Sequence, residues 1–124
     1  MTATADALMA IFGFKRVEGK QMKTDRELLE LAAKAAGIDW FDEPALQAGK
    51  GLHMKSGPFW NPLQDDGDAL RLAVALRMDL NINDEECDVF HADGCVSEVG
   101  GFDTESVVRR AIVRAAAAIG EAMQ

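Results

Sequence analysis

Oxygen-bearing side chains are densest over residues 61–68, where Asp65, Asp66 and Asp68 follow Asn61. Carboxylate and carbonyl oxygens are the ligands that Mg²⁺ and Ca²⁺ prefer, so this cluster could hold a hard cation. Its spacing differs from that of an EF-hand loop, in which acids alternate and a distant glutamate completes the site. Acids are also favoured at the start of a helix. We therefore interpret the cluster as a helix start, and we predict no bound metal and no cofactor.

Cys87, His91 and Cys95 form a second group of residue types that bind metals. Zinc sites usually have four ligands, often with a Cys-x2-Cys element, and no fourth ligand is evident here. The hairpin predicted below places Cys95 on the face opposite to Cys87 and His91. A cysteine nucleophile needs an adjacent base, and Cys87 and His91 lie too far apart along one strand face for direct contact. We predict two reduced cysteines, no zinc site and no catalytic residue.

Aromatic, basic and glycine residues gather between residues 40 and 61. A pocket for a small molecule could form there, together with the aspartate cluster, from Trp40, Lys50, His53, Lys55, Trp60, Asn61, Asp65, Asp66 and Asp68. The segment 50–57 is basic and glycine-rich, but it lacks the pattern of a phosphate-binding P-loop. The alternative is that the aromatic residues anchor an irregular region to the core.

The acidic residues are unevenly distributed along a chain whose net charge is −8. From Met78 to Val108 there are nine acids and no Lys or Arg. Such a surface repels a phosphate backbone, so we predict no direct binding of nucleic acid. It would suit a host protein with a basic surface. The acids that fall in predicted turns, and are therefore expected to be exposed, are Asp84, Glu85, Glu86 and Asp93.

Three helices are predicted, over residues 24–36, 66–77 and 104–122. Thr24 and Glu27 form a capping box, and Gly37 is a typical helix stop. Asp65 or Asp66 is expected to begin the second helix, and Asp103 or Thr104 the third. Apolar residues recur at helical spacing in all three, with Leu70, Ala73 and Val74 in the second and Val108, Ala111, Ile112, Ala115, Ile119 and Met123 in the third.

Strands are predicted over residues 78–82, 87–92 and 95–99, with a weaker one over 52–55. Asp93-Gly94 lies between two of them and is typical of a tight hairpin turn, which would pair His91 with Val96. Both faces of this hairpin carry apolar residues, so the sheet is expected to be covered on both sides. The fold class is therefore α/β (α+β), with an antiparallel sheet sandwiched between helices.

The chain is predicted to form one domain over residues 22–124, preceded by an appendage of residues 1–21. The appendage contains a short apolar stretch, which could form a helix or an arm. It could pack on its own domain, or on a second subunit to give a homodimer. No stretch matches a signal peptide or a membrane span, so we predict a cytoplasmic protein that does not bind membranes.

Three stretches together resemble one family of small phage proteins: residues 25–38, residues 60–74 with Trp60-Asn61-Pro62-Leu63 at their start, and residues 109–120. The chain from about residue 22 onward resembles the phage ABA-sandwich family. This resemblance implies a sheet between helical layers and a phage or prophage origin, hence the cytoplasm of a bacterial host. It implies no catalytic residues.

Three functions are compatible with the sequence. The first is a phage accessory protein that binds and inhibits a host protein, such as a component of antiviral defence (an anti-CRISPR protein, for example), through an acidic surface. The second is a protein that binds a small molecule or nucleotide, or a small enzyme. The third is a structural or assembly protein of the phage particle. Without a catalytic signature, the first is favoured.

Overall fold

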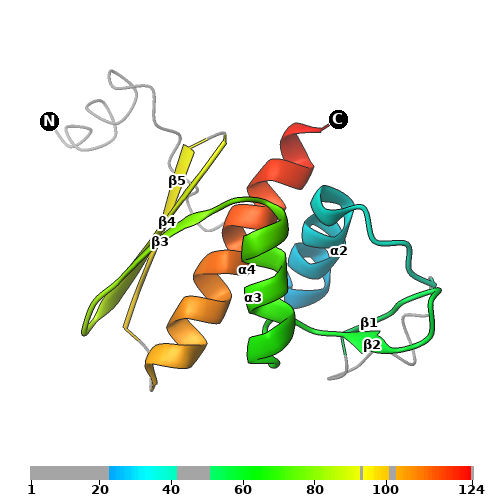
Figure 1. Ribbon diagram of the computed structural model, residues 1–124, viewed down its shortest axis with the longest axis horizontal. Coiled ribbons are helices and arrows are strands. Elements are labelled where there is room, and N and C mark those ends of the chain that lie inside the picture. Colours follow the sequence, from blue (N-terminus) through cyan, green and yellow to red (C-terminus); the bar gives the residue numbers. More distant parts are fainter. Residues whose placement is uncertain (1–22, 42–50, 93, 101–102, 124) are drawn as a thin grey trace, which may run out of the picture.

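A computed structural model describes residues 23–41, 51–92, 94–100 and 103–123 (Figure 1). In chain order the elements are helix α2 (Asp25–Ala36), strands β1 (Leu52–His53) and β2 (Phe59–Trp60), helix α3 (Asp66–Ala75), strands β3 (Asp79–Ile82), β4 (Glu86–His91) and β5 (Gly94–Val99), and helix α4 (Thr104–Ala122). Helices and antiparallel sheets in one fold confirm the predicted α/β class. The predicted appendage of residues 1–21 lies outside the described residues, as do Lys50 and Asp93 of the predicted sites.

The ends of helix α2 are set by local hydrogen bonds, as predicted. The hydroxyl of Thr24 accepts a hydrogen bond from the backbone N–H of Glu27, and the Glu27 carboxylate accepts one from the N–H of Thr24. Gly37 ends the helix in the left-handed conformation, with φ of 75°. The Ile38 N–H then reaches back to the carbonyl oxygen of Ala33.

Helix α4 forms the centre of the fold. Figure 1 shows it between the sheet of β3, β4 and β5 and helix α2, with α3 alongside. Because α4 is covered on several sides, its buried residues extend beyond the single predicted stripe. Val107 and Val113, which were not assigned to that stripe, are buried, whereas Met123 is exposed. Asp103 begins the helix by accepting a hydrogen bond from the backbone N–H of Ser106.

Helix α3 is shorter than predicted. It ends at Ala75 because Arg77 adopts the left-handed conformation, with φ of 56°, and the Met78 N–H bonds back to the carbonyl oxygen of Ala73. The predicted apolar stripe of this helix is also partly wrong. Leu70 and Val74 are 59% and 68% exposed, and the residues that face the core are Ala69, Leu72 and Ala73.

Strands β3, β4 and β5 form an antiparallel sheet in that order. The hairpin β4–β5 is confirmed, but its predicted register is wrong: His91 pairs with Gly94, and Val96 pairs with Val89. Gly94 extends β5 toward the turn with φ of 153°, a value that residues with a Cβ rarely adopt. Because the register moves by two residues, every side chain keeps its predicted face.

One face of this sheet packs against α4, while the other face is not covered by any described helix (Figure 1). By alternation along the strands, the second face, which we call the open face, carries Asp79, Asn81, Glu86, Asp88, Phe90, Cys95, Ser97 and Val99. Phe90 is 47% exposed and Val99 is 68% exposed. Helices were predicted on both faces of the sheet, but among the described residues they cover only one face.

A second, two-stranded sheet lies at the opposite end of the molecule (Figure 1). The predicted strand over residues 52–55 is confirmed in part as β1, which pairs with the unpredicted strand β2. Leu52 and Trp60 are buried partners in this sheet. The ring of His53 stacks on that of Phe59, with centroids 4.8 Å apart, and contacts the ring of Phe41 in a tilted arrangement, with centroids 4.9 Å apart. Trp60 thus anchors the hairpin to the core, whereas the rings of Phe41, His53 and Phe59 contact one another nearer the surface.

Candidate partner-binding site

The turn between β3 and β4 places several acids next to the start of α4. The Asn83 side-chain oxygen accepts a hydrogen bond from the backbone N–H of Glu85, at 3.3 Å, and the Asn83 N–H donates to the carbonyl oxygen of Glu86, at 3.0 Å. The carbonyl oxygen of Glu85 accepts a hydrogen bond from the N–H of Gly100. The backbone of the turn is therefore well anchored, while the side chains of Asp84 and Glu85 are exposed.

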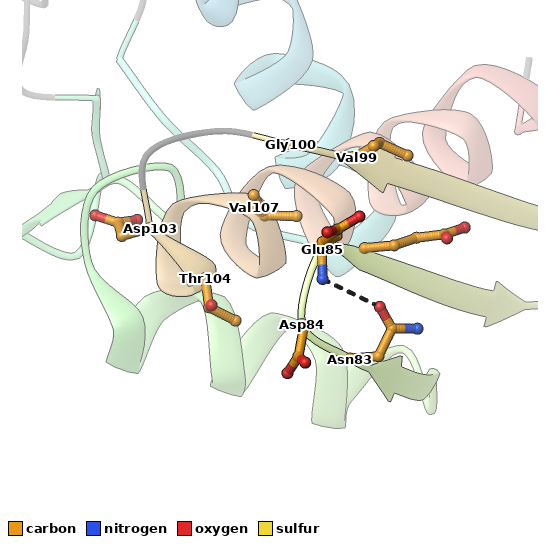
Figure 2. A pocket seen from close by; sticks show the side chains of 9 residues that line it. Asn83, Asp84, Glu85, Val99, Gly100, Asp103, Thr104 and Val107 are labelled. Atoms are coloured by element: carbon orange, nitrogen blue, oxygen red, sulfur yellow. Dashed lines mark hydrogen bonds between the residues drawn. The ribbon is translucent and has the colours of Figure 1, made fainter.

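A cavity of about 250 Å³ lies between this turn, the end of β5 and the first turn of α4 (Figure 2). Val99 and Val107 give it an apolar wall, and Thr104 and Asp103 lie on the α4 side. The acids of the turn line the other side. Its lining residues are Asn83, Asp84, Glu85, Glu86, Val99, Gly100, Asp103, Thr104 and Val107. A cavity of this composition can accept the aliphatic part of a side chain while carboxylates surround its charged end.

The acids of the turn form no ion pair with a described cation, a property that they share with Glu27, Asp39, Asp65, Asp103 and Glu105. Six described acids form ion pairs: Asp25 with Arg110, Glu30 with Arg26, Asp66 with Arg109, Asp68 with Arg71, Glu98 with Arg114, and Glu121 with Lys23. None of these pairs includes a residue of the turn or an acid of the open face. The described acids of the turn and of the open face that form no ion pair are Asp79, Asp84, Glu85, Glu86 and Asp88, which we call the acidic surface.

Two carboxylates of the acidic surface influence each other directly. Glu86 and Asp88 alternate onto the same face of β4, and the carboxyl group of Asp88 raises the pKa of Glu86, first through hydrogen bonding and second through repulsion. Asp88 also accepts a hydrogen bond of 2.6 Å from the hydroxyl of Ser97 on β5. A cation placed over these groups would relieve the repulsion between them.

Of the predicted partner-binding residues, Asp84 and Glu85 are exposed in the turn, as predicted, whereas Glu86 was wrongly assigned to the turn: it pairs in the sheet as the first residue of β4 and is half-buried. Sequence reasoning did not include Asp79 and Asp88 in that site, although their positions in alternating strands could have assigned them to one face. It also did not foresee that Asp103 lies on the opposite wall of the cavity, where the backbone and then the hydroxyl of Ser106 lower its pKa.

The predicted small-molecule pocket forms only in part. A cleft of about 520 Å³ lies between α3, the end of α2 and the hairpin β1–β2, and its lining residues are Ala36, Ile38, Met54, Pro58, Phe59, Trp60, Asp65, Asp68, Arg71, Leu72 and Ala75. Of the predicted pocket residues, it contains Trp60, Asp65 and Asp68. Its mainly apolar walls and the guanidinium of Arg71 were not foreseen.

The other predicted pocket residues have different roles. The Asn61 backbone N–H donates to the buried carboxylate of Asp68, at 2.9 Å. Asp66 points to the other side of α3 and pairs with Arg109. The Lys55 ammonium lies 6.0 Å from the centroid of the Phe41 ring, outside this cleft, and Trp40 forms a β-bridge with Met54. His53 stacks within the hairpin as described above. The predicted set therefore does not converge on one site.

Metal-binding residue types are dispersed in the described parts of the chain. No three side chains among the described His, Cys, Asp and Glu residues gather as metal ligands would. Asp65 caps α3 through the N–H of Gly67, and Cys87 and Cys95 lie on opposite faces of the sheet, as predicted, with Cys87 buried and Cys95 exposed. None of the described helices is long and apolar enough to cross a membrane. Comparison with protein-family models, with curated proteins and with solved structures gives no match.

Proposed function

We propose that this chain is a phage-encoded accessory protein that binds, and thereby inhibits, a host bacterial protein with a basic surface. The observation that supports this proposal is the acidic surface itself: five carboxylates without a described cation partner, next to a cavity with an apolar wall. Solubility alone does not require charges of one sign to be clustered, and clustering costs stability through repulsion. The resemblance of residues 22–124 to phage proteins supports the context.

The chemistry of the acidic surface favours a protein partner. Carboxylates repel the phosphate groups of a nucleic acid. The same carboxylates accept charge-assisted hydrogen bonds from the Lys and Arg side chains of a protein. The cavity beside Asp84 and Glu85 could accept a long basic side chain, with Val99 and Val107 against its methylene groups. A host protein that binds nucleic acid has a suitable basic surface, and the phage protein would inhibit it by occupying that surface.

Affinity capture with matched charge variants tests this function. Immobilised wild-type protein would be exposed to bacterial lysate in parallel with Asp84→Lys/Glu85→Lys and with the control Asp39→Lys/Glu121→Lys. Both variants change the net charge equally and alter exposed acids, but the control residues lie outside the acidic surface. Quantitative mass spectrometry would compare the proteins retained at low and at high salt.

We expect wild type and control to retain the same basic protein, and the turn variant to lose about 90% of it. Salt should weaken the wild-type complex, since screening acts on exposed charges. If both variants retained the protein equally, and if retention were the same at low and at high salt, the acidic surface would be ruled out as the binding site. Circular dichroism of the variants would show that each keeps its fold.

A second candidate function is supported by the cleft lined by Trp60. Its polar groups are already engaged, because the Asp68 carboxylate accepts hydrogen bonds from the Asn61 N–H and the Arg71 guanidinium. Such a cleft fits a small, largely uncharged ring system better than a nucleotide phosphate. In Trp40→Phe, Trp60 is the only tryptophan, and its fluorescence should respond to indole but not to inorganic phosphate. The added substitution Ala75→Leu should abolish the response if the ligand occupies the cleft.

A further inference from the structure

We infer that the partner docks a basic amphipathic helix onto the open face of the β3–β4–β5 sheet. This inference rests on the proposed function and specifies how the acidic surface is used. The charged turn alone would suit many basic proteins. The open face adds exposed apolar residues at defined positions, and these restrict the shape of what binds there.

The open face has three rows of side chains that run across the strands. Asp79, Phe90 and Cys95 form the first row, Asn81, Asp88 and Ser97 the second, and Glu86 and Val99 belong to the third. The first and third rows therefore have an exposed apolar residue each, and the middle row is polar. Every row contains one acid of the acidic surface, and the face contains no Lys or Arg.

This pattern defines the complementary surface. Phe90 and Val99 are large apolar residues with exposed side chains. They are separated by about 13 Å along the strands. Asp88 lies between them and has Ser97 as its described hydrogen-bond donor, which leaves acceptor positions on the carboxylate. A fitting partner presents two apolar side chains at that separation with a Lys or Arg in between, and further basic residues toward Asp79 and Glu86.

A helix meets these requirements best. Sheet faces are commonly covered by helices, as α4 covers the other face of this sheet. With a rise of about 1.5 Å per residue, a separation near 13 Å corresponds to two to three helical turns. Apolar residues seven or eight positions apart share one stripe of a helix and are separated by about 10.5–12 Å, and side chains of the length of leucine can cover the remaining distance. Basic residues in the intervening turn extend from the same face. The partner element is therefore an amphipathic helix in which basic residues interrupt the apolar stripe of one face.

Labelled synthetic peptides provide the probe. The first is an alanine-rich helical peptide of about 18 residues, with two leucines about two turns apart and lysines between them on one face. The second has the same composition, with the leucines on opposite faces. Fluorescence anisotropy would compare their binding to wild type, to Phe90→Thr/Val99→Thr and to Leu70→Gln/Val74→Gln. The last variant is the matched control, since Val74 and Val99 are both 68% exposed and Leu70 is also exposed.

We expect wild type and the α3 control to bind the first peptide about tenfold more tightly than the second, and the open-face variant to lose that preference. Threonine keeps the strand propensity, so the sheet should remain folded, which circular dichroism would verify. An open-face variant that binds like wild type would overturn docking on this face, and so would an absence of binding by wild type.

A further variant separates this inference from the proposed function. Asp84→Lys/Glu85→Lys should weaken binding of both peptides, because it acts on charge and not on the apolar positions. If it weakens binding while Phe90→Thr/Val99→Thr does not, the acidic surface binds basic partners without the helix geometry inferred here. If only the open-face variant weakens binding, the helix docks as inferred and the turn is not required.

Discussion

Gly120 in α4 lies directly against the backbone of Leu31 in α2. A Cβ atom added at Gly120 would stand 2.0 Å from the carbonyl oxygen of Leu31. Real Cβ atoms do not approach a backbone oxygen so closely, so the two helices meet at a distance that only glycine allows. Buried alanines on both helices, including Ala32 and Ala116, extend this close contact. The pairing of α2 with α4 therefore depends on residues without long side chains.

Replacing Gly120 with alanine should destabilise the protein, although alanine is the better helix former. Overpacking at a rigid backbone contact typically costs about 1–3 kcal/mol, whereas the gain in helix propensity is smaller. Urea denaturation would measure the free energy of unfolding. Gly67→Ala in α3 is the control, because its added Cβ would meet mainly the flexible end of Arg71, and it should stabilise by about 0.5–1 kcal/mol. A Gly120→Ala protein as stable as wild type would contradict the close contact.

The two cysteines should differ strongly in reactivity. Burial, and then the neighbouring Asp88 carboxylate, raise the pKa of Cys87, which reduces its thiolate fraction at neutral pH. Cys95 is exposed on the open face. In a reaction with an aromatic disulfide reagent, we expect a fast phase from Cys95 and a phase from Cys87 that requires unfolding. Cys95→Ser should lack the fast phase, and a fast phase that persists in this variant would show that Cys87 is accessible.

Neutralising Glu86 should stabilise the protein at neutral pH. The pKa of Glu86 is higher in the folded state than in the unfolded state. Protonated Glu86 therefore stabilises the folded state below its unfolded pKa, and this stabilisation is lost as the pH rises through its folded pKa. Glu86→Gln removes the repulsion with Asp88. We expect its midpoint of urea unfolding to exceed that of wild type near neutral pH, and the difference to vanish in acid. A difference that is constant across pH would have a cause other than charge.

Asp103 should show the opposite dependence on pH. The pKa of Asp103 is lowered by hydrogen bonds from the backbone and hydroxyl of Ser106, so its contribution is present above its unfolded pKa and is lost as pH falls through its folded pKa. Asp103→Ala should lower the melting temperature by a few degrees at neutral pH, and this gap should close in acid. Asp103→Asn keeps an acceptor for the helix start, so it should lose less. Equal losses in both variants would show that charge, not capping, dominates.

Local signals made both ends of α2 and the start of α4 predictable. Thr24, Glu27 and Gly37 define the ends of α2 through contacts within a few residues, and Asp103 begins α4 in the same way. The register of the β4–β5 hairpin was not predictable from Asp93-Gly94 alone, because either neighbouring pair of residues can occupy a tight turn. Strand β2 was missed because two residues carry no periodicity, and its pairing with β1 depends on packing of the whole fold.

The candidate site was predictable only where the charge and exposure of a residue depend on its neighbours in the sequence. Asp84 and Glu85 lie in a turn, and turns are on the surface. Whether Asp88 and Phe90 are exposed depends on which side of the sheet the helices occupy, and that is decided by contacts between distant segments. The proximity of Asp103 to the turn has the same origin, since the start of α4 reaches it only when α4 packs on the sheet.

The charges of the described residues are distributed asymmetrically, with an excess of acids on the sheet of β3, β4 and β5. The described Lys and Arg residues all lie outside strands β3, β4 and β5, whereas the acids of the open face have no compensating cation beside them. In the field of a positively charged partner, a molecule of this kind rotates before contact, so that more encounters begin in the correct orientation. Two copies that approach with these sheets facing would instead repel each other, which keeps the surface accessible at high concentration. The same separation of charge would therefore accelerate the correct association and suppress self-association.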